Sequence, residues 1–401
     1  MRKTQDDKLD LKTEAVLEST IQFNNPLSKN LIEPKSIFLT GATGFLGAYL
    51  LDELLHKTTA NIYCLVRCNH FDEGKQRLQN HLQFYSLWNE KFSSRIIPIV
   101  GDLSKPLFGL SEQQFSDLAH HIDVIYHNGA QVNAARPYEA LKTTNVLGTQ
   151  EILRLASLIQ TKAVHFISSI AVFFSQAHHQ ADIKETDDPD GNTLKGGYRQ
   201  SKWVAEQLII AAQERGLPAS IYRAGRIWGH SQTGITGNLD DLLCGLIKGC
   251  IQMGSFPTSD IVINVAPVDY ISQAIIHLSR QSFGKVFHLL NPHSIAWKQF
   301  FELIRALGYF LEEISNDEWL AELKRRASQK PKDKLYSMLL LMMRLSAFFS
   351  DNKPQFRADH THERLTGTSI VCSPVDAKLL STYFSYFHKS GYIESRYLSK
   401  G

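Results

Sequence analysis

The stretch Ile37-Phe-Leu-Thr-Gly-Ala-Thr-Gly-Phe-Leu-Gly47 decides the fold of this chain. Its first three residues form the short apolar run of a buried strand, and residues 45–56 carry apolar side chains at helical spacing. Between strand and helix, Gly41 permits a sharp turn, Gly44 lets a pyrophosphate approach the backbone, and Gly47 lets the helix pack closely against the sheet. A glycine triplet alone often marks only a turn. With a strand before it and a helix after it, whose first N–H groups attract phosphate, it favours a dinucleotide-binding site.

Length, charge and cysteine content bound the class of protein. The 401 residues suit one large domain, or one with a smaller domain attached. With 43 basic and 40 acidic residues, the formal charge of +3 gives no indication of nucleic-acid binding. Five cysteines without a Cys-x-x-Cys pair indicate a reducing compartment, so we expect a cytoplasmic protein. The 16 histidines show no metal-ligand spacing, and we expect no metal site, signal peptide or transmembrane segment.

Apolar runs and helical patterns alternate along residues 35–215. Each predicted strand is a short apolar run, followed by a turn and by a segment with helical periodicity. Five such alternations indicate a parallel sheet covered by helices on both faces, the doubly wound α/β arrangement of the Rossmann type. Ligands of such sheets bind beyond the carboxyl ends of the strands. The predicted strands are 37–39, 61–67, 96–100, 123–127 and 163–167.

The residue that ends the second predicted strand bears on the choice of cofactor. A fold of this kind that selects NAD usually places an acidic residue there, to bind the 2′-hydroxyl of the ribose. This chain has Arg67, with Arg77 one helix later. Arginine matches a 2′-phosphate, so the sequence predicts NADPH, although an ordinary surface arginine would look the same. After the third strand, Asp102 is placed to accept a hydrogen bond from the adenine amine.

A tyrosine and a lysine lie four residues apart at the start of a helix predicted over residues 197–215. Tyr198 and Lys202 therefore share one helical face. A neighbouring ammonium group favours the phenolate, so we expect the pKa of Tyr198 to be lowered toward the range useful for acid–base chemistry. The spacing alone is common by chance. Together with a serine at the end of the fifth strand and the glycine turn, it indicates a catalytic set.

These motifs carry a family resemblance. TGATGFLG, the Ser-Ser pair at 168–169 and YRQSK resemble the extended short-chain dehydrogenase/reductase family. IYCLVR, HNGAQVN, TNVLGT, YRAGRIWGHSQTG and APVDY narrow it to the thioester reductase domains of non-ribosomal peptide synthetases, polyketide synthases and carboxylic acid reductases. The leader fragment EAVLESTI is similar to the linker that joins such domains to an upstream carrier protein. The resemblance covers the chain from about residue 14 to its end.

The resemblance implies roles for the matching positions. Ser169 matches the Ser/Thr that binds the substrate oxygen, Tyr198 the acid, and Lys202 the residue that binds the nicotinamide ribose. Ser168 competes with Ser169, which we favour because the active hydroxyl of the family stands three residues before a valine, here Val172. The predicted cofactor-binding residues are Gly41, Thr43, Gly44, Phe45, Leu46, Gly47, Arg67, Arg77, Asp102, Leu103, Asn128, Gly129, Ala130, Asn145, Tyr198, Lys202 and Ala224. The family usually has proline at the position of Ala224, so the loop there is expected to be less rigid.

The implied reaction is the NADPH-dependent reductive release of an acyl or peptidyl thioester, carried by the phosphopantetheine of a carrier protein or by CoA, to an aldehyde. Whether a second reduction to an alcohol follows stays open. We expect a leader at residues 1–34, a Rossmann domain at 35–228 plus 262–291, and a mostly helical substrate lobe at 229–261 plus 292–401.

Three alternatives to this reaction remain. A fatty acyl-CoA reductase is a close variant of it. A sugar-nucleotide epimerase or dehydratase of the same superfamily would favour NAD and an acid at position 67. A non-catalytic NADPH-sensing module would be expected to lack Tyr198 or Lys202, and this chain has both.

Two adjoining segments of the predicted lobe have a second interpretation. Residues 335–349 are apolar and hold three of the five methionines, which suits a buried helix or a pliable wall for an apolar substrate. The stretch is too short for a membrane span. Directly before it lies the densest basic run of the chain, either a solvated helix end or a docking surface for an acidic carrier protein. This run comprises Lys324, Arg325, Arg326, Lys330, Lys332 and Lys334.

Overall fold

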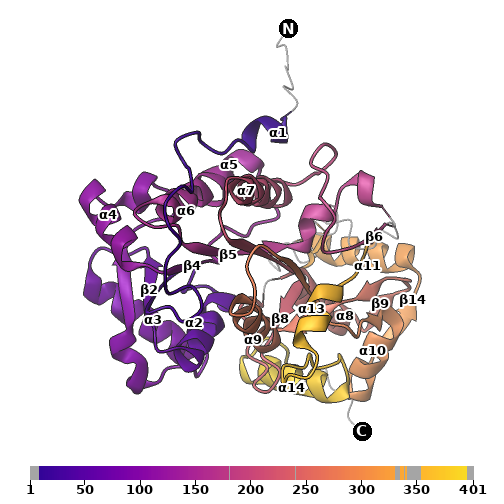
Figure 1. The fold of residues 1–401 in the computed structure, drawn as a ribbon. Helices are drawn as coiled ribbons and strands as arrows, with labels where there is room; N and C mark the ends of the chain where they lie inside the picture. The colour runs from indigo at the N-terminus through magenta and orange to yellow at the C-terminus, as the bar shows by residue number, and fades with distance from the viewer. Residues whose placement is uncertain are drawn as a thin grey trace.

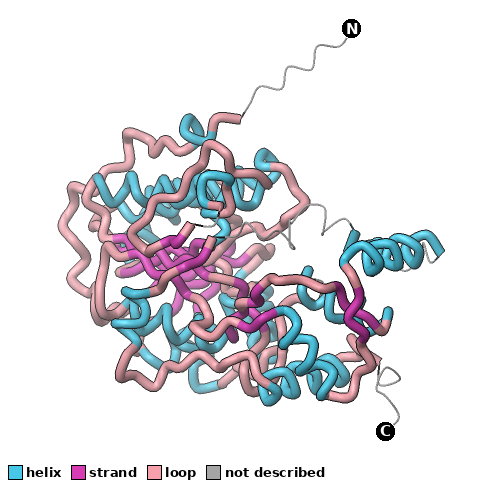
Figure 2. Tube along the Cα trace, turned by 90° about the vertical axis from the view of Figure 1, so that its right-hand side faces the viewer, coloured by secondary structure: helices cyan, strands magenta, loops and turns pink. Residues whose placement is uncertain are grey.

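A computed structural model describes residues 9–394 of the chain, except 180, 240, 330–334, 338 and 341–353. Figure 1 shows a sheet with helices on both faces and, at the lower right, a second lobe built largely of helices. Figure 2, turned by 90°, shows the strands stacked between these helical layers. The predicted fold class, a doubly wound α/β domain with a smaller helical lobe, is confirmed.

Seven parallel strands form the central sheet, in the order β12-β7-β5-β4-β1-β2-β3. The strand order reverses between β1 and β4, which pair directly, with Thr40 opposite His127. Such a switch point leaves a crevice at the carboxyl ends of the two strands, where dinucleotides bind in open α/β sheets. The bounds are β1 Ser36–Thr40, β2 Asn61–Val66, β3 Ile96–Val100, β4 Val124–His127, β5 Ala163–Ser169, β7 Ala219–Ala224 and β12 Val286–Leu289.

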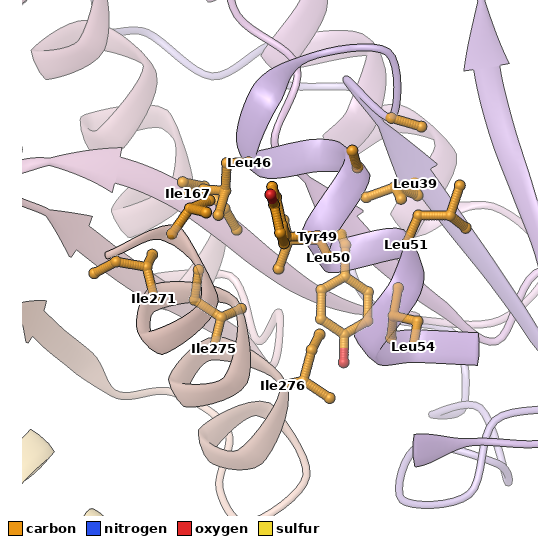
Figure 3. Close-up of a cluster of buried hydrophobic side chains, with 14 of the residues drawn as sticks. Leu39, Leu46, Tyr49, Leu50, Leu51, Leu54, Ile167, Ile271, Ile275 and Ile276 are labelled. Atoms are coloured by element: carbon orange, nitrogen blue, oxygen red, sulfur yellow. The ribbon is translucent and has the colours of Figure 1, made fainter. Parts of the chain in front are cut away.

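Both faces of the sheet are buried, which explains why its strands are apolar along their whole length rather than at alternate positions. In β1, Ile37 and Leu39 face one helical layer and Phe38 faces the other. Figure 3 shows part of the first core, in which apolar side chains of α2, such as Leu50, and of α9, such as Ile275, belong to one buried cluster. The first layer comprises α2 Phe45–Lys57, α3 Phe71–Phe84 and α9 Val268–Ser279, and the second comprises α4 Glu112–His121, α5 Tyr138–Lys142, α6 Gly148–Ser157 and α7 Gly197–Glu214.

The second lobe has its own core around three fully buried tryptophans. Trp297 and Trp319 donate their indole N–H groups to the carbonyl oxygens of Pro257 and Ser255, at 2.6 and 3.1 Å, so these large side chains are buried without an orphaned donor. The third is Trp228. The lobe contains α8 Leu242–Met253, α10 Trp297–Ala306, α11 Asn316–Gln329, α14 Ala377–Lys389 and the short strands β8 Arg226–Trp228, β9 Ser255–Pro257, β10 Val262–Ile263, β11 Val265–Pro267, β13 Ile295–Ala296 and β14 Glu312–Ile314.

The chain returns from this lobe to the sheet through α13 Asp359–Leu365, which contacts β12 and α9. Just before it, β15 Gln355–Phe356 pairs with β6 Asp182–Ile183. The division of the chain into a Rossmann domain and a substrate lobe at the predicted bounds stays a prediction.

The leader packs along the sheet domain. It contains one short helix, α1 Leu11–Glu14, among the residues that the structure describes, and this helix lies beside α5 and α7 in Figure 1. Downstream of α1, the backbone carbonyls of Leu17, Glu18 and Ile21 accept hydrogen bonds of 2.6–2.9 Å from the guanidinium of Arg215. From residue 9 onward, the buried apolar side chains of the leader include Leu11, Leu17, Ile21 and Phe23. We call residues 15–30 the leader strap.

The helix that follows β2 ends at a left-handed turn. Helix α3 stops at Phe84 because Ser86 adopts a left-handed conformation with φ of 61°, and the N–H of Leu87 then bonds back to the carbonyl of Leu82 at 2.8 Å. Of the methionine-containing stretch, only 335–337 and 339–340 lie within the described residues. Tyr336 and Leu339 there are buried in the core of the second lobe.

Candidate active site

The glycine turn joins β1 to α2 at the switch point of the sheet. Gly41 has φ of +74°, a conformation that side-chain-bearing residues rarely adopt. A Cβ atom at Gly47 would lie 1.9 Å from the carbonyl oxygen of Gly41, so only glycine lets α2 start this close to the turn. Gly44 caps α2 without a side-chain hydrogen bond, and the first turn of α2 contains no acidic residue. The N–H groups at the start of this helix are therefore left for an anion.

A chain of hydrogen bonds behind the turn fixes the neighbouring loop. The hydroxyl of Thr149 donates to the carbonyl of Asn145 at 2.7 Å, so it must accept from Nε2 of buried His127 at 3.0 Å. Nδ1 of His127 then accepts from the hydroxyl of Thr40 at 2.9 Å, and Thr40 in turn accepts from the N–H of Gly129 at 2.8 Å. Burial, with a smaller effect from Lys202, lowers the pKa of His127 to about 3, so this histidine is a neutral link.

Asn145 lies in a single π-helical turn, Thr143–Leu147, between α5 and α6. Such bulges displace a residue from the regular helical register and are frequent at functional sites. The side chain of Asn145 is buried and accepts from the N–H of Gln131 at 2.7 Å, while its amide donates to the hydroxyl of Ser201 at 2.9 Å. It thereby connects the loop after β4 with the first turns of α7.

The two serines at the end of β5 point to different surroundings, because successive strand residues face opposite sides. Ser168 is buried and donates its hydroxyl proton to the carboxylate of Glu206. Ser169 is partly exposed and accepts from the N–H of Ala171 at 3.2 Å, and its hydroxyl lies near enough to the phenol of Tyr198 to lower the pKa of that phenol. Of the pair, Ser169 is thus the hydroxyl that lies with the tyrosine.

Tyr198 and Lys202 lie on the same face at the start of α7. The pKa of Tyr198, however, is shifted in the direction opposite to the one predicted from the sequence. Burial raises the pKa of Tyr198 to about 12, and the neighbouring hydroxyl of Ser169 opposes this only in part. The prediction that Lys202 lowers the pKa of Tyr198 is therefore wrong. The ammonium of Lys202 instead donates to the carbonyl of Ile167 at 2.7 Å and lies 4.1 Å from the ring centroid of Phe166. Burial lowers the pKa of Lys202 to about 7, against the opposing effect of Glu206.

The opposite end of the site lies beyond β2 and β3. Arg67 and Arg77 are both exposed, and Arg77 donates to the carbonyl of Arg67 at 2.7 Å, which places the two guanidinium-bearing residues together. Asp102 accepts from the N–H and hydroxyl of Ser104 at 2.9 and 2.8 Å. Although burial works to raise it, these bonds and the nearby cations Arg67 and Lys105 hold the pKa of Asp102 below its usual value.

The structure brings the predicted site residues to one edge of the sheet. Each group follows a different strand or opens a different helix, as the prediction required. Gly41 to Gly47 follow β1, Arg67 follows β2, Asp102 and Leu103 follow β3, Asn128 to Ala130 follow β4, Ser169 ends β5 and Ala224 ends β7. Ala224 pairs with both Ser169 and Leu289, and the N–H of Gly225 donates to Leu289 at 2.9 Å, so the missing proline leaves this strand end within the sheet.

The residues around the switch point fit a nicotinamide dinucleotide. A Cβ atom at Gly41 would lie 2.8 Å from the Cα of Gly129, so the two loops meet with bare backbone toward the space where a pyrophosphate would lie. Asn128 joins them by donating to the carbonyl of Gly41 at 3.3 Å. Nε2 of His81 lies 3.1 Å from the carbonyl of Gly44, and burial lowers the pKa of this histidine, which favours the neutral ring.

Comparison with known proteins identifies the family. The chain superposes on the crystal structure of the terminal R domain from the myxalamid PKS-NRPS biosynthetic pathway with a TM-score of 0.91 and 42% identity, over 96% of this chain and 98% of that domain. This chain belongs to the terminal reductase (R) domains. The family described as male sterility protein, a group of NAD-binding domains, matches residues 39–275. The resemblance to extended short-chain dehydrogenases/reductases and to the thioester reductase domains within them is therefore confirmed, and the cofactor is a nicotinamide dinucleotide.

The curated relatives are longer proteins, and this reductase domain spans 8–36% of the length of those it was aligned with. It is 40% identical over 389 residues to a linear gramicidin synthase of Brevibacillus parabrevis, an alignment that covers 96% of this chain but 8% of that protein. It is 31% identical to the L-2-aminoadipate reductase of Eremothecium gossypii, over 90% of this chain and 28% of that protein. Among solved structures, the R domain of a non-ribosomal peptide synthetase from Mycobacterium tuberculosis superposes with a TM-score of 0.79 at 25% identity, covering 96% and 97% of the two chains.

Within the described ranges, no three histidine, cysteine, aspartate or glutamate side chains gather where a metal ion could bind. None of the helices in the described part of the chain combines the length and apolar character needed to cross a bilayer.

The basic run is described only up to residue 329, and Lys330, Lys332 and Lys334 lie outside the described residues. Lys324 and Arg325 are exposed on α11. Arg325 and Arg326 both bind the carboxylate of Glu322, at 2.6 Å each, so one acid offsets part of the positive charge that the sequence suggested.

The sequence did not indicate the buried polar residues whose hydrogen bonds fix the loops of the site. Thr40, His127 and Thr149 show no pattern along the chain because they come from three separate elements. Glu206 was within reach of a spacing argument, since it follows Lys202 by four residues on the same face of α7. Its partner Arg223 comes from β7, and only the fold brings the two together.

Proposed function

We propose that this reductase domain reduces an acyl or peptidyl thioester to an aldehyde with NADPH. The observation that carries the proposal is the proximity of Ser169 and Tyr198 at the carboxyl edge of the sheet, with Lys202 one helical turn along α7 and the bare glycine turn at the same edge. A hydroxyl, a phenol and an ammonium group around one point suit the reduction of a carbonyl.

Tyr198 serves as the acid in this mechanism. Since burial holds its pKa at about 12, the phenol keeps its proton at neutral pH and is ready to donate it. The hydroxyl of Ser169 and the phenol both donate to the carbonyl oxygen of the thioester, which stabilises the negative charge that develops there. NADPH, when bound, supplies the hydride that goes to the carbonyl carbon.

Lys202 and the glycine turn position the reactants. Lys202 would hold the ribose next to the nicotinamide, and the start of α2 with Gly41 and Gly44 would hold the pyrophosphate. The thioester carbon gains the hydride, the oxygen gains the proton of Tyr198, and collapse of the resulting hemithioacetal breaks the carbon–sulfur bond to release thiol and aldehyde. A second cycle on the aldehyde gives an alcohol.

The choice of NADPH rests on Arg67 and Arg77. Both are exposed at the end of β2 and are held together by the bond between Arg77 and the carbonyl of Arg67. Two guanidinium groups at this position suit the dianionic 2′-phosphate that distinguishes NADPH from NADH.

The thioester substrate is proposed to arrive on a carrier protein. One solved relative is a thiolation-reductase di-domain from an archaeal non-ribosomal peptide synthetase, with a TM-score of 0.76 and 25% identity over 96% of this chain. That arrangement supports a phosphopantetheine thioester as substrate. Acyl-CoA, which carries the same arm, is the second candidate. The epimerase alternative receives no support from position 67, where NAD would require an acid.

The deciding experiment measures NADPH oxidation by absorbance against a panel of acyl thioesters on CoA, pantetheine and a carrier protein, with the products identified by mass spectrometry. We expect oxidation that depends on the thioester, together with free thiol and aldehyde or alcohol. NADH should be a much poorer reductant. Absence of thioester-dependent oxidation, with turnover of a UDP-sugar instead, would contradict the proposal.

A further inference from the structure

A fully buried ion pair lies directly behind the proposed catalytic residues. Glu206 on α7 and Arg223 on β7 have side-chain exposures of 0% and 1%. One carboxylate oxygen of Glu206 accepts from both Nε and Nη2 of Arg223, at 2.9 and 2.8 Å. A buried pair of this kind rarely increases stability over an apolar replacement of similar volume, because both charges lose their hydration. Its presence next to a reactive centre therefore suggests another role.

The second carboxylate oxygen of Glu206 holds Ser168. That serine donates its hydroxyl proton to Glu206 from within the core. Ser168 and Ser169 are adjacent on β5, so fixing the inward side chain fixes the direction in which the next one points. The ion pair therefore influences the orientation of the Ser169 hydroxyl through Ser168, the residue directly before it.

Glu206 also sets the electrostatic surroundings of Lys202. From α7 itself, the charged group near Lys202 is Glu206, four residues further along the helix. From β5 it faces the carbonyl of Ile167, and from β4 the ring of His127, which burial keeps neutral. Glu206 is thus the negative charge that favours the protonated form of Lys202 in a site that otherwise disfavours it.

Arg223 is fixed at its other end, so it cannot follow Glu206 if the carboxylate moves. Its Nη1 donates to the carbonyls of Glu185 and Asp187, at 3.2 Å each. Nη1 also lies 3.3 Å from Nε2 of His288. Because His288 donates from Nδ1 to the carbonyl of Arg357 at 2.6 Å, its Nε2 is free of a proton and accepts from Arg223. Glu206 is therefore the carboxylate that pairs with Arg223, while burial and the neighbouring Arg223 lower the pKa of His288 to about 4 and keep its ring neutral.

We propose that Glu206 and Arg223 are positioning residues of the reductase site, which orient Ser169 through Ser168 and balance the charge that keeps the Lys202 ammonium protonated. The inference deepens the proposed function, since it takes Lys202 to be the residue that binds the cofactor ribose. Removing either partner alone should change the charge at Lys202 in opposite directions.

The test compares Glu206→Gln, Arg223→Met and the double variant with the wild type. The dissociation constant of NADPH is measured from pH 6 to 10 by the fluorescence of the bound nucleotide. Affinity should fall as pH rises and Lys202 loses its proton. In Glu206→Gln, with the titration extended down to pH 5, the midpoint of that fall should move down by about one pH unit, in Arg223→Met it should move up by a similar amount, and in the double variant it should return close to the wild-type midpoint.

A second readout does not need the cofactor. The pH dependence of the thermal unfolding midpoint is measured for each variant with and without Lys202→Met, and the difference within each pair reports the proton on Lys202. The pH at which this difference begins should be lower in Glu206→Gln and higher in Arg223→Met than in the wild type. If the wild type binds no NADPH, the proposed cofactor is wrong, and the unfolding series still decides the role of the ion pair.

A purely structural role predicts a different pattern. Both single variants would then lose stability and activity without moving either midpoint, and the double variant would be no better than the singles. Midpoints that stay fixed, or that move in the same direction in Glu206→Gln and Arg223→Met, overturn the proposal.

Discussion

The two ends of the proposed cofactor site are built differently. At the end formed by β4, β5 and α7, Asn145, Lys202 and Ser169 are each held by hydrogen bonds to neighbouring elements. At the end formed by β2 and β3, Arg67 and Arg77 are exposed on the surface. The difference matches the tasks. Carbonyl chemistry needs donors that are already oriented when the substrate binds, whereas recognition of a phosphate needs charge that can reach it.

The largest effect on turnover should follow from a change at the end formed by β4, β5 and α7, which we call the ordered end. Tyr198→Phe removes the acid while keeping the ring that packs behind it, so kcat should fall by about 10²–10⁴-fold. NADPH affinity should stay nearly unchanged, because the phenol acts on the substrate. Steady-state turnover and a nucleotide titration measure the two quantities. Retention of more than about a tenth of kcat would mean that another residue is the acid, and Lys202→Ala, which should damage both quantities, is the control.

The two adjacent serines sharpen the comparison within one strand end. Ser169→Ala should lower kcat by about 10²-fold, since it removes a donor to the developing oxyanion. Ser168→Ala removes only the bond to Glu206 and should cost about tenfold or less. Both variants are measured under saturating NADPH. A larger loss for Ser168→Ala would reverse the assignment of the two hydroxyls.

At the exposed end the expected effect is on binding. Arg67→Ala should weaken NADPH by roughly 1.5–3 kcal/mol, the range for a lost charge-assisted contact, and leave NADH almost unaffected. Because the contact is exposed, the preference for NADPH should also decrease with salt. Equal losses for both nucleotides in a titration would contradict the role of Arg67.

Lys202 links the ordered end to stability. Its pKa in the folded protein is about 7, well below the ordinary value near 10.5, so the unfolded chain binds one more proton across the interval between these values. Stability should therefore rise with pH through that interval and be lowest below it. Lys202→Met should remove this rise, and calorimetry at pH 6.5 and 9 measures the change. An unchanged pH dependence would show that the ammonium is not desolvated.

The smallest effect is expected at the basic run. If a carrier protein docks there, reversing Arg325 and Lys332 to Glu should slow reduction of a carrier-bound thioester several-fold, mainly through association, and the wild-type rate should fall with salt. Reduction of acyl-pantetheine should be untouched. The pairing of Arg325 with Glu322 reduces the expected effect. Equal slowing of both substrates, or of neither, would exclude this surface from docking.

The sequence predicted the site residues that directly follow the parallel strands. Gly41, Arg67, Asp102, Asn128 and Ser169 each follow a strand, and parallel strands bring their carboxyl ends to one edge, so position along the chain was sufficient. Helix α7 was predicted from its start because Gly197 opens it beside the tyrosine.

What the sequence could not predict depends on side-chain direction and burial. The spacing of Tyr198 and Lys202 placed them on one face, but not that Lys202 would bond to Ile167 or that burial would raise the pKa of the phenol. Arg223 lies in an apolar strand where its partner is distant in sequence.

The leader strap has a practical consequence for anyone who shortens this chain. A protein that began at Lys35, where the first strand is about to start, would lose the three carbonyls that accept from Arg215 and the apolar side chains of Ile21 and Phe23. It would also leave Asp123 without the side chains of Ser28 and Asn30. The apolar side chains of α7 that Ile21 and Phe23 cover would then be exposed to solvent. Such a fragment should aggregate more readily than the longer chain.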